Sequence, residues 1–505
     1  MSIYTPSNVT GIYWAYNDGF KRGRDPLGIQ NSSVATYSNL LPGMTNLTGH
    51  IRYYSLYCWL LNEYDKLDKA NLTKINQYNF IRRAELALAL IMKDFKLGSV
   101  VGSLFVAQDK CIISEDGYYN LAQGADYESK EKYWTYQTGA FGQYYLGSLI
   151  YFDLVKIEEK RFYLRDEGKK LAEAFRNSVD KEVQDLFIEC LIDGEIGKEE
   201  ISFLTPLRLN KIEKESPEWD SLNKLLTKKD GNSSLRRETL LLFLKDFKQG
   251  IDKEEFVRYR FLNVDISDLE CQAVFGWYFY FLCEVLHYAL ETIFCLFLNR
   301  IKELGNPTVW ELLNNLKEGI KEENSKIQIY KSVEEWKNEI DLDINSGFDD
   351  LKEEIRNQNY VKGAYRSFIL LLRLYDELEV NKELILKFEK DNDLLKQRGI
   401  FSRTLEEYVG RNLDTTIDNF IEIVFTRIMQ EHSYVALNKM GKSNVDLRKF
   451  LIEDGRINLV EIRYPTQTSP RINSLYNFLK DMNYITNENT LSEIAENYIA
   501  NYGKE

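Results

Sequence analysis

The sequence feature that most restricts the fold is a long apolar stretch from Ala273 to Leu298, with six aromatic residues between positions 275 and 281. The stretch is long enough to cross a membrane as a helix. Three polar residues, Glu284, His287 and Glu291, interrupt it, and a charged group at the centre of a bilayer costs at least ~2.5 kcal/mol. The pattern therefore predicts a fully buried core helix and no membrane partner.

The rest of the sequence indicates a mainly helical protein. The chain has 505 residues, several times the length of a typical domain, and only 8 of them are proline. Leu, Lys and Glu dominate the stretches between helix-breaking residues, a mixture that favours long helices. We expect a mainly α, multi-unit helical protein with one or two winged-helix-like modules that contain short strands.

We expect five units, divided where the periodicity of the sequence changes. The first is an N-terminal helical unit, the third and fourth are helical, and the second and fifth are the winged-helix candidates. Their ranges are 1–125, 126–200, 201–345, 346–443 and 444–505. In the second unit, Arg161–Leu164 is expected to be a strand and 166–175 a helix.

A block near the N-terminus has the most specific pattern in the chain. It reads Leu27-Gly28-Ile29, Leu40-Leu41-Pro42-Gly43, Thr45, Thr48, and Arg52-Tyr53-Tyr54 with Tyr57 and Trp59. Pro42 and Gly43 end a helical approach, and Thr45 or Thr48 can accept backbone N–H groups at the start of the next helix. That helix is expected from about His50 to Tyr64.

This block resembles the opening of a family of uncharacterised bacterial proteins that are often encoded among antiphage defence genes. In that family LGI is followed by LLPG or LFPG, a threonine-rich turn, and RY in an aromatic-rich helix. The resemblance covers roughly forty residues, and His50 stands where the family has arginine. It implies a role in bacterial defence, with other defence-system proteins as partners, and it implies no reaction.

Charge and cysteine usage limit the class of protein. The net charge of −13 argues against a nucleic-acid coat protein driven by bulk charge, and leaves a local basic surface open. The six cysteines form no CxxC pair, and the first residues lack a basic region followed by an apolar core. Both observations predict a reduced, cytoplasmic protein.

The C-terminal unit contains the candidate DNA-binding residues Arg471, Asn473, Asn477 and Lys480. The last three recur at i, i+4 and i+7 on a predicted amphipathic helix, 471–482. Asn and Lys side chains can reach base edges. Strands are expected at 459–462 and 484–486, and nearby basic residues make the region locally basic: Lys439, Lys442, Arg448, Lys449, Arg456 and Arg463.

DNA is one of two partners that this pattern permits. The basic residues can equally form a solvated face, and winged-helix modules also bind proteins. On the N-terminal block, Arg52 is a candidate anion-binding residue beside Tyr53, Tyr54 and Tyr57. Aromatic stripes on helices are more often core, so the alternative is that the block fixes a helix start and its packing.

The motifs that would indicate catalysis are incomplete. Glu284 and His287 form a Glu-x-x-His pair, which begins carboxylate-bridged metal sites, but a second such pair is missing because Glu431 directly precedes His432. We therefore expect no metal, and a polar stripe satisfied by other helices, for instance by Arg236 or Arg237.

Two further motifs also depart from their standard patterns. Residues 436–443 fit only the loosest phosphate-binding loop, with Ala436 in place of its first glycine. Glu461-Ile462-Arg463 offers arginine where a metal-dependent nuclease needs lysine. We expect no cofactor and a non-catalytic DNA- or protein-binding component of a defence system. The alternatives are a metal-dependent nuclease and a purely structural scaffold subunit.

Overall fold

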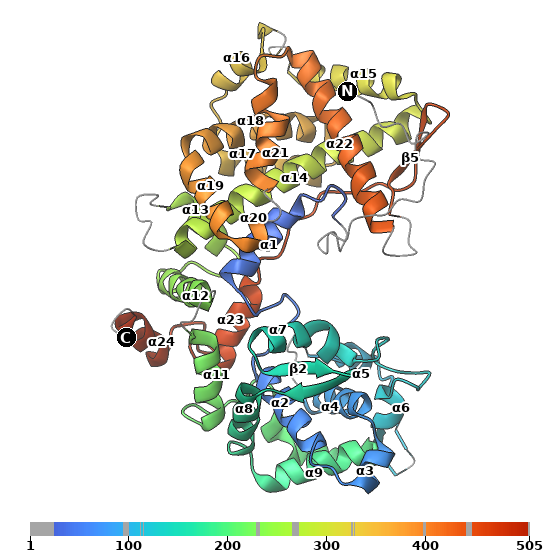
Figure 1. The fold of residues 1–505 in the computed structure, drawn as a ribbon, viewed down its shortest axis with the longest axis vertical. Coiled ribbons are helices and arrows are strands. Elements are labelled where there is room, and N and C mark those ends of the chain that lie inside the picture. The colour runs from blue at the N-terminus through green and yellow to red at the C-terminus, as the bar shows by residue number, and fades with distance from the viewer. Residues whose placement is uncertain are drawn as a thin grey trace. The chain divides into compact units, whose positions relative to one another are not determined.

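The computed structural model describes residues 25–93, 100–111, 113–114, 116–228, 233–264, 272–324, 327, 329–396, 400–440 and 447–502 (Figure 1). It is 66% helix and 5% strand, and its strands form two-stranded antiparallel sheets. The expectation of a mainly α-helical protein is confirmed.

The chain forms two compact units, each assembled from separated stretches. Unit 1 comprises Met1–Asn39 and Val257–Thr468, and unit 2 comprises Leu40–Phe256 and Ser469–Glu505. The expected fifth unit, 444–505, therefore contributes to both. The other expected boundaries lie inside these two units and stay predictions.

Unit 1 is built around helix α14 (Gln272–Leu304), which contacts α15, α17, α18 and α22 (Figure 1). Every residue from Ala273 to Leu298 is buried, so the prediction of a core helix is confirmed. Within the described residues α14 is the one helix long and apolar enough to cross a membrane, and its most apolar part lies wholly inside the structure.

The remaining elements of unit 1 pack around α14, and the terminal residues of α1 and α13 lie across the unit boundary. They are α1 (Gln30–Leu40), α13 (Phe256–Leu262), α15 (Val309–Glu323), α16 (Val333–Asn338), α17 (Ile344–Arg356), α18 (Tyr360–Val380), α19 (Lys382–Asp391), α20 (Asp393–Lys396), α21 (Ile400–Tyr408), α22 (Ile417–Met440), β5 (Phe450–Glu453) and β6 (Arg456–Leu459).

Unit 2 packs its helices around α2 and α4. Its elements are α2 (Arg52–Tyr64), α3 (Lys69–Lys74), α4 (Gln77–Ile91), α5 (Ser103–Ala107), β1 (Tyr119–Asn120), α6 (Leu121–Ala125), the π-helix η2 (Phe141–Tyr145), α7 (Leu146–Tyr151), β2 (Val155–Glu158), β3 (Arg161–Leu164), α8 (Asp166–Arg176), α9 (Lys181–Asp193), β4 (Glu195–Ile196), α10 (Lys198–Phe203), α11 (Pro217–Thr227), α12 (Ser233–Lys248), α23 (Ile472–Asp481) and α24 (Glu493–Asn501).

The LLPG part of the N-terminal block is fixed by helix α12. Thr239 donates to the carbonyl of Leu40, and the Arg236 guanidinium donates to the carbonyl of Pro42 at 2.8 Å. Gly43 has a φ of +76°, and a Cβ there would lie 2.6 Å from the ring of Phe152. This turn therefore needs glycine for both its backbone conformation and its packing.

The start of α2 differs from the expected threonine cap. Thr45 and Thr48 bond to each other within the turn. The acceptor for the Ile51 N–H is instead the carboxylate of Asp481, at 3.2 Å, which also lies 3.1 Å from Nδ1 of His50. A residue from α23 therefore completes the first turn of α2, which short-range patterns cannot indicate.

Both four-residue hairpins have the positive-φ turn residues that a two-residue loop requires. In β2–β3, Val155 pairs with Leu164, and Glu159 and Lys160 at the tip both have positive φ, as a two-residue hairpin turn requires. Hairpin β5–β6 turns at Asp454-Gly455 in the same way. The strand at 161–164 and the helix beginning at 166 are confirmed.

The two strands expected in the C-terminal unit are wrong. Residues 460–462 continue beyond β6 without regular structure: the N–H groups of Val460 and Glu461 both donate to the carbonyl of Lys449, directly before β5, and the ladder ends there. Residues 484–486 contribute a single bridge, Ile485 to Leu491.

Candidate functional site

Helix α14 places three ionisable residues on one buried stripe. Glu284, His287 and Glu291 are 4%, 0% and 1% exposed. His287 Nε2 lies 3.2 Å from Glu291 Oε1, and its Nδ1 lies 3.9 Å from Glu284 Oε2. Burial alone would lower the pKa of the imidazole, but the two carboxylates outweigh it and raise that pKa to about 10. The two carboxylates therefore favour the protonated form of His287.

The carboxylates of the stripe bind the chain's own extended segment, 460–468. Glu284 accepts the Thr468 N–H and hydroxyl, both at 2.6 Å. Glu291 accepts the Thr466 N–H at 2.9 Å, and the Gln30 side-chain amide of α1 at 3.4 Å. Burial opposes ionisation of Glu284, but His287 and Thr468 hold the pKa of this carboxyl below its usual value. The stripe is thus a clamp for two segments of unit 1.

These partners correct the expectation that Arg236 or Arg237 satisfies the stripe. Arg236 donates to backbone carbonyls in unit 2, and the guanidinium of Arg237 lies over the ring of Tyr502. Backbone N–H groups of segment 460–468, and not a side-chain cation of α12, bind the carboxylates of the stripe. Within the described residues, no group of three or more His, Cys, Asp and Glu is positioned to hold a metal ion.

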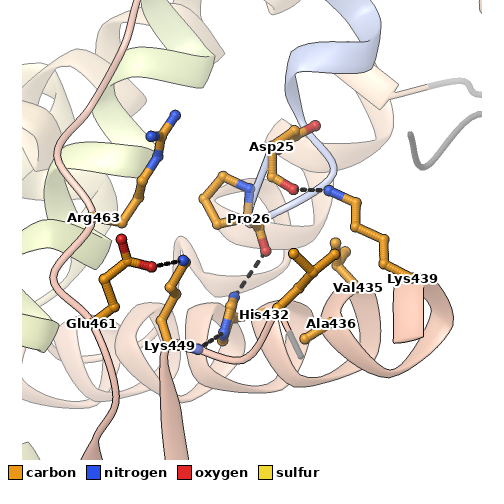
Figure 2. Close-up of a pocket in the computed structure, with 10 residues that line it drawn as sticks. Asp25, Pro26, His432, Val435, Ala436, Lys439, Lys449, Glu461 and Arg463 are labelled. Atoms are coloured by element: carbon orange, nitrogen blue, oxygen red, sulfur yellow. Dashed lines mark hydrogen bonds and ion pairs between the residues drawn. The ribbon is translucent and has the colours of Figure 1, made fainter. Parts of the chain in front are cut away.

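A cavity of about 310 Å³ lies in unit 1. Figure 2 shows its lining side chains, which come from the chain before α1, from α22, and from the stretches flanking hairpin β5–β6. Its lining residues are Asp25, Pro26, His432, Val435, Ala436, Lys439, Leu447, Lys449, Glu461 and Arg463.

His432 is a packed, neutral residue of this cavity. Its Nδ1 lies 3.0 Å from the carbonyl oxygen of Pro26, and its Nε2 accepts the Lys449 N–H at 2.9 Å (Figure 2). One ring nitrogen therefore donates and the other accepts, which defines a neutral tautomer. Burial lowers the pKa of His432 to about 4.

Asp25 lies at the edge of the cavity, five residues before the start of helix α1. Its carboxylate accepts the N–H groups of Leu27, Gly28 and Gln30, and its carbonyl accepts from the Lys439 ammonium. Burial raises the pKa of Asp25, and Lys439 partly offsets this. Asp25 was absent from the candidates drawn from the sequence; an aspartate directly before Pro26 and a helix is the signal that could have indicated it.

Arg52, the candidate anion-binding residue, is 2% exposed. Its guanidinium donates to Glu218 at 3.0 and 3.1 Å and to the carbonyls of Pro206 and Arg208 at 2.7 Å. The structure therefore gives Arg52 internal acceptors. The tyrosines beside it are buried, in agreement with the packing alternative.

Helix α4 contains a buried carboxylate that the sequence reasoning missed. Glu85 is 0% exposed and accepts the hydroxyls of Tyr57 and Tyr133 and the N–H groups of Ala140 and Phe141. Burial raises the pKa of this carboxyl. A glutamate within an otherwise apolar helical face is the signal that could have identified it.

The candidate DNA-binding residues lie on or beside α23 in unit 2. Arg471 donates to the carbonyl of Leu41 at 2.9 Å. Asn473 accepts from Lys253 at 2.7 Å, while Lys480 donates to Asn489 at 2.9 Å. Asn477 is half-buried. The helix thus brings Asn473, Asn477 and Lys480 together, as expected, with two of them in intramolecular contacts.

Three of the other basic residues, Lys439, Lys449 and Arg463, line the cavity of unit 1. In unit 1, Lys439 donates to Asp25, Lys449 to Glu461, Arg456 to the carbonyl of Asn306 and Arg463 to Thr466, whereas Arg471 belongs to unit 2. Lys442 lies outside the described residues. Residues 436–440 of the loose phosphate-loop motif continue helix α22, and 441–443 lie outside the described residues.

No protein-family model, curated protein or solved structure matches this chain. What its site can do must therefore follow from geometry and chemistry.

Proposed function

We propose that this protein is a non-catalytic component of a bacterial antiphage defence system that binds DNA, a partner protein, or both. The genomic setting comes from the resemblance of the N-terminal block. The non-catalytic part of the proposal is supported above all by one observation: Glu284 and Glu291, which the sequence offered as candidate metal or catalytic residues, bind Thr466 and Thr468 of the same chain.

We propose that two regions of unit 2 act as binding modules, and that the first of them is winged-helix-like. In the first, α7 is followed by hairpin β2–β3 and by α8. The surface of α8 pairs its own charges, with Lys169 bonded to Asp166 and Lys170 to Glu167. The three acidic and three basic side chains of α8 leave this helix without a net positive charge to attract DNA, so we propose a protein partner for this module.

The second region is α23, where Asn477 and Lys480 remain the best candidates for DNA contact. Lys480 is already bonded to Asn489, a neutral acceptor, so no ion pair must break before it contacts a phosphate. A Lys–phosphate contact contributes to the salt dependence of binding, whereas an asparagine that reads a base edge does not.

Binding of duplex DNA to the full-length protein, followed by fluorescence anisotropy over a salt series, tests the DNA arm. Lys480→Ala is expected to weaken binding and reduce the salt slope by about one. Asn477→Ala is expected to weaken binding without changing the slope. Lys169→Ala on α8 is the matched control. If both α23 variants bind DNA with unchanged affinity and slope, α23 does not contact DNA.

Affinity purification of the tagged protein, with and without nuclease, tests the protein arm. Stable protein partners that survive nuclease support a subunit of a multi-protein system. Magnesium-dependent DNA cleavage that is lost in Glu461→Gln would instead support the nuclease alternative. Absence of any nucleic-acid affinity at low salt, with partners retained, would support a structural scaffold.

A further inference from the structure

We propose that the cavity of unit 1 shown in Figure 2 is a binding site for a small phosphate-bearing molecule. The proposal concerns residues that the proposed DNA contacts do not use. It rests on the charges around the cavity, on a lining arginine whose hydrogen bond to Thr466 is long, and on the size and apolar wall of the space.

Three cations line the cavity: Lys439, Lys449 and Arg463. Lys449 is paired with Glu461. The lysine side chain is only 17% exposed, whereas that of Glu461 is 64% exposed, so the carboxylate stands at the solvent-facing rim. Because a pair with one partner in water contributes little, an incoming phosphate can replace Glu461 as the partner of Lys449.

Arg463 has donor capacity that the described protein atoms do not use. Its Nη2 donates to Thr466 at a long 3.3 Å, and its Nε is buried without an acceptor among the described residues. A buried donor left without a partner is unfavourable. This Nε is closed to a ligand in the cavity, but Arg463 lines the cavity and is half-buried, so the Nη donors of its guanidinium can contact the oxygens of a phosphate.

The two carboxylates that line the cavity, Asp25 and Glu461, do not cancel its preference for an anion. The Asp25 carboxylate accepts hydrogen bonds from the N–H groups of Leu27, Gly28 and Gln30. These donors at the start of α1 stabilise its negative charge. His432 is neutral, with both ring nitrogens engaged by Pro26 and Lys449. Three cations therefore face two carboxylates, one of which is displaceable.

The dimensions point to a small ligand. About 310 Å³ is at the lower end of the range for small-molecule sites, ~300–1,000 Å³. Pro26, Val435, Ala436 and Leu447 form an apolar wall. A cationic side and an apolar side fit a phosphorylated molecule with a flat or apolar body, of the size of a nucleoside monophosphate.

Calorimetric titration of the full-length protein with AMP tests the proposal, with inorganic phosphate and adenosine as comparison ligands. Lys449→Gln is expected to weaken AMP binding about tenfold, because a charge-assisted hydrogen bond is lost. Glu461→Gln is expected to tighten AMP binding, because the competing carboxylate is removed.

Arg463→Gln is expected to weaken AMP binding, with partial recovery in Arg463→Lys. Lys352→Gln, which removes a cation of helix α17 that is paired with Asp349, is the matched control for net charge and should leave affinity unchanged.

The opposite signs of Lys449→Gln and Glu461→Gln separate a ligand site from a structural ion pair, since loss of structure would weaken binding in both. A second readout is hydrogen exchange at the Thr466 amide, which follows Arg463 in the same segment and should slow when AMP is bound. The proposal is overturned if AMP and phosphate do not bind, if adenosine binds as tightly as AMP, or if both variants shift affinity in one direction.

Discussion

Removal of the buried imidazolium is the perturbation with the largest expected effect on unit 1. His287→Leu would leave Glu284 and Glu291 as two carboxylates inside an apolar helix without the cation between them. Loss of one partner of a buried ion pair costs about 3–5 kcal/mol. The raised pKa gives a similar figure: a rise from 6.5 to about 10 corresponds to on the order of 5 kcal/mol.

This contribution depends on pH in a defined direction. The folded-state pKa of His287 is raised above the unfolded value, so its contribution is fully present below pH 6.5 and is lost as pH rises through about 10. The lowered pKa of Glu284 acts oppositely: its contribution is present above the unfolded value of 4.5 and is lost as pH falls through the lower folded value. The cluster should stabilise unit 1 most between these limits.

Calorimetry and hydrogen exchange of α14 amides together measure the effect, since exchange there reports on unit 1 alone. The melting temperature of unit 1 in His287→Leu is expected to fall by roughly 6–20 °C at pH 6. The difference from the parent protein should shrink at pH 10. The triple variant Glu284→Gln, His287→Leu, Glu291→Gln is the matched control, because its glutamines still accept the Thr466 and Thr468 N–H groups without an uncompensated charge.

The reasoning would be refuted in either of two ways. One is a loss below ~1 kcal/mol in His287→Leu that stays constant between pH 6 and pH 10. The other is a triple variant as unstable as the single one, which would show that volume and not charge determines the effect.

Two further substitutions test unit 2. Arg52→Met is expected to destabilise it by about 3–5 kcal/mol in urea unfolding, because Glu218 loses its buried cation, and adding Glu218→Gln should recover much of that loss. Gly43→Ala is expected to cost about 1–3 kcal/mol more than Gly117→Ala in thermal unfolding, because both have positive φ but only at Gly43 would Cβ meet the Phe152 ring, at 2.6 Å. Equal shifts for the two glycine variants would contradict the packing argument.

Local elements were predictable from the sequence because short-range patterns encode them. The continuous apolar run of α14 identified a core helix, and the helix expected at 471–482 corresponds to α23, Ile472–Asp481. Helical periodicity depends on residues three and four positions apart, so a helix can be recognised without knowledge of the tertiary structure.

Long-range pairing was not predictable, and it determines both the units and the candidate site. Thr468 and Glu284 are 184 residues apart, and nothing in a pattern around Thr468 indicates that its backbone N–H faces a carboxylate. The same reason explains why the continuous range 444–505 was expected to be one unit. A sequence pattern of strand, loop and helix identifies the separate elements. It does not indicate which hydrophobic core each element joins.

The crossing of the chain between the two units has a consequence for biosynthesis. In unit 2, the acceptor for the Ile51 N–H at the start of α2 is Asp481, 430 residues later in the chain. At translation rates of ~5–20 residues per second, the ribosome takes roughly 20–90 s to supply it. Unit 1 likewise requires Thr466 and Thr468 to cover the carboxylates of α14. Unit 2 therefore cannot complete its fold until Asp481 has been made, and a fragment that ends at Phe256 should not reproduce this unit.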